Sequence, residues 1–162
     1  MFAVRYLALA ALVVWLGGMI VLALLVAPST FRVLQAHDAA TGRVLAGALF
    51  GDILRHFYVL AYGCGAVIFL CLFIMKFVGP PPRAFALRAA IVAVMLALAV
   101  YAGVPVSREI AQLQSDVAGP INQLPDTDAR RVRFDRLHAT STTLMTVNMG
   151  LGLVLLFWYV RE

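Results

Sequence analysis

Four long apolar runs dominate the chain, and most of its polar residues lie in the segments between them. The runs cover residues 6–27, 57–76, 84–106 and 139–160. Each is close to the length of about 20 residues that an α-helix needs to cross the hydrocarbon core of a bilayer. Because unpaired backbone groups are costly in lipid, a spanning segment outside a closed barrel must be helical. The pattern therefore predicts an all-α integral membrane four-helix bundle, with one four-span domain over residues 1–162.

Composition agrees with this pattern. Hydrophobic residues make up 63% of the chain and charged residues 13%, whereas a soluble domain has about 45–50% apolar and about 25% charged residues. The formal net charge is +5. In a membrane protein, basic residues face anionic headgroups and set topology. The expected partner is therefore the lipid bilayer, and no nucleic-acid partner is implied.

The basic residues are distributed unequally between the two membrane faces. With four spans, five Lys or Arg residues lie on the face of the two termini and the 2-3 connection, and eight lie on the face of the other two connections. The more basic face is usually cytoplasmic. We therefore expect a multi-pass protein of the inner (cytoplasmic) membrane, with both termini outside and the 1-2 and 3-4 connections in the cytoplasm.

Helical sequence continues beyond two of the spans on one side. The stretch TGRVLAGALFGDILRHF leads into the second span, and PDTDARRVRFDRLH leads into the fourth. Pro125, Asp126 and Asp128 suit a helix start, because they match the capping and dipole preferences of the first turn. We expect helices 2 and 4 to extend beyond the bilayer on the same side.

Polar residues of the fourth span follow one helical face. Spacings of three and four residues join Phe134, His138, Ser141, Met145, Asn148 and Gly152. This seam is expected to point into the protein, and Leu151, Leu155 and Tyr159 are expected to face lipid. Trp15 lies at the middle of the first span. We predict that Trp15 and Asn148 are neighbours within hydrogen-bonding reach; the alternative is that each has a different partner.

A second group of polar residues lies where spans 2 and 4 enter the membrane. Both helices enter from the same side, so Asp52, Arg55 and His56 should lie at a depth similar to that of Asp135 and His138. Ionisable residues at such a position pair with one another or mark a functional site. The sequence predicts a rim cluster that contacts a solute or a partner, or that only anchors the helices.

Metal and haem sites are open alternatives. Cys64 and Cys71 share a helix face but lie about 10 Å apart along the axis, too far to share one ion or a disulfide. One thiol with Met75, Met145 or Met149 is a candidate for a soft metal ion. His56 and His138 are candidates for bis-histidine haem ligation. A further alternative is transport of a small solute along the seam, with an oligomer as the working unit.

Three stretches resemble a known family. They are WLGGMIVLALLVAPSTF, AGALFGDILRHFYVLAYGCG and RFDRLHATSTTLMTVNMGLGL, of which the last carries Phe134, Leu137, His138 and Ser141. The chain resembles the transmembrane protein 205-like domain family of small four-span proteins with largely undefined function. The resemblance implies an integral membrane bundle and a loose link to export or to metal handling by sulfur. It implies no ligand set here, because Cys64 and Cys71 form no close pair.

The sequence shows no nucleophile paired with a base, no phosphate-binding loop and no paired carboxylates of a hydrolase. We therefore expect a non-enzymatic inner-membrane protein without a required cofactor. The alternatives are an oligomeric exporter or channel subunit for a small solute or metal, and a haem-binding bundle.

Overall fold

The computed structural model describes residues 2–38, 41–79, 84–117 and 121–161, and every regular element within them is helical. In chain order these elements are α1 (Phe2–Val21), η1 (Leu22–Val26), α2 (Ala27–His37), α3 (Gly42–Val78), α4 (Phe85–Tyr101), η2 (Ala102–Val106), α5 (Ser107–Ser115), η3 (Ile121–Gln123) and α6 (Ala129–Val160).

These elements form four long helices, because η1 joins α1 to α2 and η2 joins α4 to α5 without a break. The four helices span Phe2–His37, Gly42–Val78, Phe85–Ser115 and Ala129–Val160, and each is long and apolar enough to cross a membrane. The prediction of an all-helical, multi-pass membrane protein is confirmed. The first and third helices are longer than the predicted spans, since they continue to His37 and Ser115.

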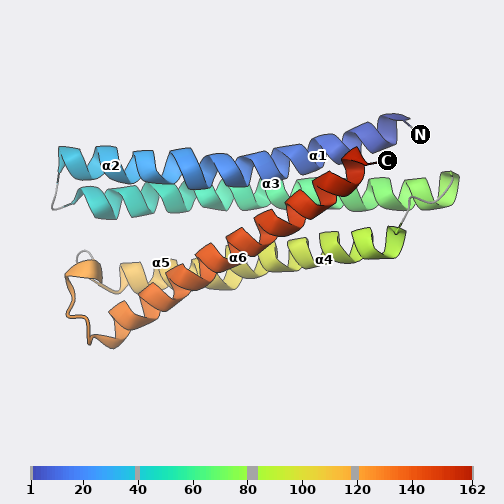
Figure 1. Ribbon diagram of the computed structural model, residues 1–162. Coiled ribbons are helices and arrows are strands. Elements are labelled where there is room, and N and C mark those ends of the chain that lie inside the picture. The colour runs from blue at the N-terminus through green and yellow to red at the C-terminus, as the bar shows by residue number, and fades with distance from the viewer. Residues whose placement is uncertain (1, 39–40, 80–83, 118–120, 162) are drawn as a thin grey trace.

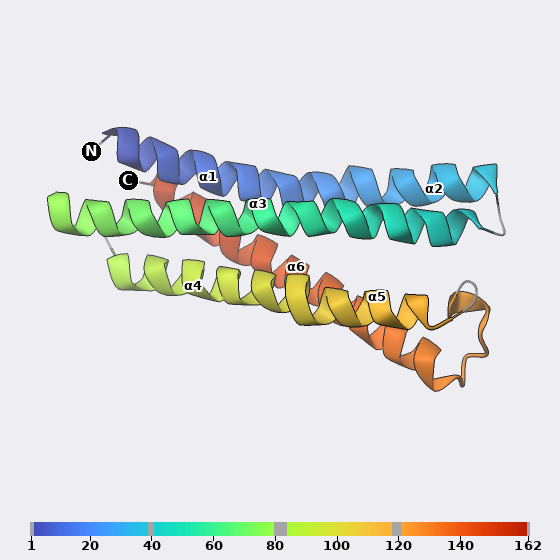
Figure 2. The same ribbon diagram turned by 180° about the vertical axis from the view of Figure 1, so that it is seen from behind.

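The four helices pack together at one end and diverge at the other. The α1–α2 helix lies along α3, the α4–α5 helix lies on the other side of α3, and α6 crosses the bundle diagonally (Figures 1 and 2). Both chain ends lie at the packed end, which we call the terminal end. At the opposite, splayed end, α2 stays with the first half of α3, and α5 stays with the first half of α6.

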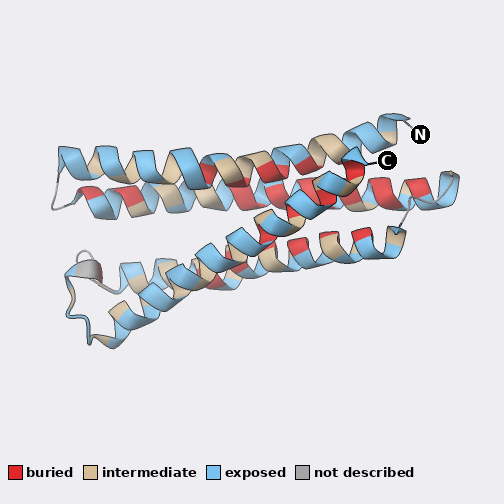
Figure 3. Ribbon diagram, viewed as in Figure 1, coloured by how far each residue is buried: buried red, intermediate tan, exposed pale blue. Residues whose placement is uncertain are grey.

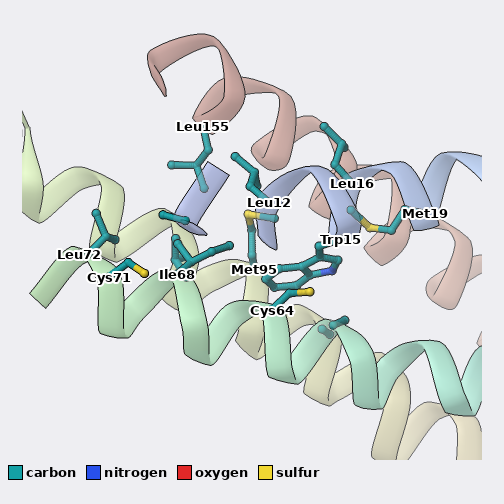
Figure 4. Close-up of a cluster of buried hydrophobic side chains, with 14 of the residues drawn as sticks. Leu12, Trp15, Leu16, Met19, Cys64, Ile68, Cys71, Leu72, Met95 and Leu155 are labelled. Carbon is teal, nitrogen blue, oxygen red and sulfur yellow. The ribbon is translucent and has the colours of Figure 1, made fainter. Parts of the chain in front are cut away.

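Buried residues concentrate toward the terminal end (Figure 3). The α1 helix contributes Leu12, Leu16 and Met19, which pack with Met95 of α4 and Leu155 of α6 (Figure 4). By contrast, neither α2 nor α5 has a buried residue. The core therefore holds the terminal end together, and the splayed end is held mainly by contacts within each helix pair.

Two residues of α6 face the opposite way from the prediction. Leu155 and Tyr159 were expected to face lipid, but they are 0% and 9% exposed. They continue the spacing of three and four residues that begins at Asn148 and Gly152, so all four residues share one buried stripe. The face of α6 that is exposed includes Val147, Val154 and Phe157.

The first and third helices each contain a π-helical segment beside a proline. Leu22–Val26 precedes Pro28, and Ala102–Val106 contains Pro105. Proline lacks a backbone N–H and interrupts regular helical hydrogen bonding. The hydroxyl of Ser107 donates to the carbonyl of Ala102 over 2.8 Å. The π-helical segments let both helices continue where an α-helix would be disrupted.

The α2–α3 connection depends on close backbone packing at Gly42. A Cβ atom there would lie 2.0 Å from the backbone oxygen of Leu34. The backbone cannot move aside as the end of a flexible side chain can.

We expect Gly42→Ala to lower the free energy of unfolding by about 1–3 kcal/mol, because the added methyl group overpacks this position. Reversible unfolding in detergent micelles measures the change. The matched control is Gly51→Ala, since nothing lies within 4 Å of that position; it should stabilise α3 by about 0.5–1 kcal/mol. Equal effects of the two substitutions would contradict this account.

The start of α6 is capped as the sequence predicts. The carboxylate of Asp128 accepts a hydrogen bond from the backbone N–H of Arg130 over 2.9 Å and also binds the Arg130 guanidinium. The hydrogen bonds from the Arg130 side chain and backbone lower the pKa of Asp128.

A lowered pKa in the folded state makes this capping pH-dependent. Its stabilisation is present above the unfolded carboxyl pKa of about 4 and is lost as the pH falls through the lower folded pKa. We expect backbone amides in the first turn of α6 to lose hydrogen-exchange protection, relative to intrinsic rates, over that acidic range. Asp128→Asn should keep the protection at acidic pH, because an amide oxygen also caps a helix. A protection profile that is the same in both proteins would contradict the assignment.

Candidate binding pocket between the four helices

A pocket lies where α6 crosses the other three helices, between the packed core and the splayed end. About 290 Å³ of space between atoms collects there, part of it open at the mouth, and about 10 Å³ is open to the centre of a water-sized molecule. The second volume is about what one water molecule requires. The pocket is lined by Trp15, Met19, Leu54, Phe57, Tyr58, Leu98, Ala99, Ala102, Leu144, Met145 and Asn148.

Asn148 is the most deeply buried polar side chain of the pocket, with 4% of its surface exposed. Its Nδ2 donates a hydrogen bond to the backbone oxygen of Met95 over 3.0 Å. Its Oδ1 is buried and has no hydrogen-bond partner among the described residues. Leaving such an acceptor unsatisfied costs about 1–3 kcal/mol, so the pocket contains an unused acceptor where lipid supplies no donor.

Trp15 lines the same pocket and is 1% exposed. The prediction that Trp15 and Asn148 are neighbours is confirmed, but no direct hydrogen bond joins them, because Oδ1 of Asn148 is unpartnered. Figure 4 shows the indole nitrogen of Trp15 turned toward the side of Met19 rather than that of Ile68. The indole contributes an aromatic wall to the pocket.

Two tyrosines of α3 form the adjoining wall against η2. Tyr58 is 7% exposed, and its hydroxyl is close enough to Ser141 to interact with it. The rings of Tyr58 and Tyr62 stack with centroids 6.3 Å apart, and the Tyr62 hydroxyl donates to the carbonyl of Ala99 over 3.3 Å. A Cβ atom at Gly103 would lie 2.7 Å from Cγ of Tyr58. The glycine therefore allows the tyrosines to pack directly on the π-helical segment.

The predicted rim residues on α3 lie outside the pocket. Asp52, Arg55 and His56 are all exposed. The Arg55 guanidinium donates to the carboxylate of Asp52 over 3.0 Å, and Nδ1 of His56 lies 2.9 Å from the backbone oxygen of Asp52. The three residues form a local group on the outer face of α3.

The charged residues of α5 and α6 form a separate group. Arg133 pairs with Glu109, which links α6 to α5. Asp135 and His138 are exposed, and the His138 ring stacks on Phe134 with centroids 6.2 Å apart. Among the described residues, no hydrogen bond or ion pair joins this group to the one on α3. The prediction of one cluster with two histidines is therefore not met, and the prediction that His138 points inward is wrong.

The sequence analysis gave no site role to two polar residues that are buried in the structure. Arg88 is 3% exposed, and its guanidinium lies 5.1 Å from the centroid of the Tyr159 ring at the terminal end. Tyr58 contributes to the pocket wall. In both cases a signal was present, because Arg88 continues the spacing of Val92 and Met95, and Tyr58 continues that of Ala61.

The described residues contain no cluster of side chains suited to a metal site. No group of three or more His, Cys, Asp or Glu residues there could hold a metal ion. Cys64 and Cys71 are both buried and free. Neither His56 nor His138 lines the pocket, so the two haem-ligand candidates do not share a site.

Comparison with known proteins identifies the family of the chain. A family model described as a domain of unknown function (DUF4149) matches residues 10–118. This range includes the parts of α1, α3 and α4 that line the pocket, and it ends before α6. The resemblance to the transmembrane protein 205-like domain family has no support from this comparison. No curated protein and no solved structure matches the chain.

The unpartnered oxygen of Asn148 predicts how substitutions there affect stability. We expect Asn148→Leu to unfold with a free energy no lower than that of the wild-type protein, and up to about 2 kcal/mol higher, because it removes an unsatisfied buried acceptor. The Met95 carbonyl keeps its own bond within α4. Asn148→Ala should be less stable than Asn148→Leu, since it leaves a larger cavity. Reversible unfolding in mixed micelles measures both variants. A marked loss of stability in Asn148→Leu would mean that the amide holds the bundle together.

Proposed function

This chain belongs to the DUF4149 family, whose function is undefined, and we propose that it is a non-enzymatic inner-membrane protein that binds a small solute between its four helices. The observation that carries the proposal is the unpartnered Oδ1 of Asn148 at the pocket. A buried polar group without a partner lowers the stability of the folded protein. Natural proteins keep such a group where their function requires it. A bound solute would supply the missing partner.

Access from the splayed end fits the distribution of polar groups. Ser141 and Tyr58 lie on that side of Asn148. On the terminal side, most buried residues are apolar and include Leu12, Leu16 and Leu155; Arg88 is also buried there, against Tyr159. A channel or exporter would need a polar route through this apolar region. We therefore favour a protein that holds a solute over one that passes it across the membrane, and the oligomeric exporter is the second candidate.

The lengths of the helices support their extending beyond the bilayer at the splayed end. The 37 residues of α3 correspond to about 55 Å of helix, compared with a hydrocarbon core of about 30 Å. Positive residues are more numerous on this side, which supports a cytoplasmic location for the splayed end. In this arrangement, the charged groups on α3 and α6 lie on the cytoplasmic parts of these helices, outside the pocket.

Solute access to the pocket can be tested with Trp15 as the reporter. The chain has two tryptophans, Trp15 and Trp158, so Trp158→Phe leaves one that lines the pocket. In lipid nanodiscs, we expect acrylamide, a small uncharged quencher, to quench Trp15 in a concentration-dependent manner. Filling the pocket by Ala99→Leu should reduce this quenching severalfold. The matched control is Ala97→Leu, which is exposed on the same helix and should have no effect.

Two other outcomes are possible: quenchers reach Trp15 from the lipid, or acrylamide does not reach Trp15 through the pocket. If lipids with brominated acyl chains quench Trp15 more strongly than acrylamide does, the pocket opens to the bilayer rather than to the splayed end. If acrylamide quenches the wild-type protein and the Ala99→Leu variant equally, the quencher does not reach Trp15 through the pocket. Either result would refute the proposed binding site.

A further inference from the structure

We infer that the solute bound in this pocket is an uncharged hydroxyl compound with a flat apolar body. The inference rests on the proposed function and specifies its ligand. None of the eleven lining residues is Asp, Glu, Lys, Arg or His. A charged ligand would therefore lose its hydration inside the membrane without gaining a counter-charge, which is costly.

The polar atoms of the pocket define the group that they can bind. Oδ1 of Asn148 is an acceptor without a partner, and Nδ2 of the same side chain is already bound to the Met95 oxygen. The ligand must therefore donate a hydrogen bond. Trp15 lies on the same pocket, and no described hydrogen bond involves its indole N–H. A hydroxyl can donate to Asn148 and accept from an indole N–H, whereas an ether cannot donate and an ammonium cannot accept.

The walls of the pocket determine the rest of the ligand. Trp15, Phe57 and Tyr58 contribute aromatic surfaces, and Met19 and Met145 contribute thioether side chains. Aromatic rings pack well on both kinds of surface. A planar, unsaturated body therefore suits these walls better than a branched or strongly hydrated one.

The available space determines how such a ligand is placed. Only about 10 Å³ is open to the centre of a water-sized molecule, so the inner part of the pocket has room for one oxygen-sized group. The hydroxyl therefore occupies the position beside Asn148. The apolar body occupies the more open part of the pocket, against the aromatic and thioether walls.

Three fluorinated aromatic probes separate these requirements. 4-Fluorophenol supplies a hydroxyl donor, 4-fluoroanisole has a similar shape without the donor, and 4-fluorobenzylammonium carries a charge. Binding is measured with the Trp158→Phe protein in nanodiscs as the saturable change in Trp15 emission, and the linear change caused by partitioning into lipid is subtracted. We expect 4-fluorophenol to bind about tenfold more tightly than either of the other probes, as one hydrogen bond to a buried acceptor implies.

Variants then locate the discriminating group. Asn148→Leu should reduce the advantage of 4-fluorophenol over 4-fluoroanisole to near zero. Thr146→Val is the matched control, because Thr146 is exposed on α6 and its hydroxyl donates to the carbonyl of Thr142. It should keep the tenfold preference.

The outcomes distinguish this inference from the proposed function. Equal binding of the phenol and the anisole would overturn the donor requirement, and tighter binding of the ammonium would overturn the requirement for an uncharged ligand. In both cases the pocket would still be a binding site. Saturable binding of none of the probes would refute the ligand class and the binding function together. These comparisons use the wild-type pocket and do not depend on whether a variant folds.

Discussion

Hydrocarbon offers no hydrogen-bond partner, so the polar groups of this chain must be satisfied within the protein. The threonines of α6 meet this requirement locally: Thr140, Thr142, Thr143 and Thr146 each donate to the carbonyl four residues earlier. These hydroxyls can therefore face outward at little cost. Asn148 cannot satisfy both ends of its amide in this way. It bonds to a neighbouring helix at one end and has no described partner at the other, which distinguishes it from these threonines.

The apolar core and the candidate pocket lie in different parts of the bundle. The apolar core lies toward the terminal end, where α1, α3, α4 and α6 all meet (Figure 3). The helix pairs at the splayed end contribute few buried residues. The pocket lies at the boundary between the two regions.

Hydropathy predicted the four helices, because the length and apolar character of a span are properties of the sequence alone. Spacing predicted the burial of Asn148, and depth in the membrane predicted its proximity to Trp15. Depth did not predict the contacts of the two histidines, since His56 and His138 are both exposed and no hydrogen bond or ion pair between them is described. The direction of a side chain depends on how a helix is rotated about its axis, and α6 crosses the bundle diagonally. The error at Leu155 was avoidable, because that residue continues the same spacing as Asn148.

The π-helical segments also affect the relation between sequence and helix face. A π-turn accommodates one residue more than an α-turn, and one residue corresponds to a rotation of about 100° around the axis. Residues beyond Leu22–Val26 are therefore out of phase with those before it, and the same holds for Ala102–Val106. Phe31, which lies beyond the first segment, packs against Phe50 of α3 with ring centroids 6.4 Å apart. Deleting one residue from either segment would leave hydropathy unchanged, convert the π-turn to an α-turn and keep the following helix against the same neighbours.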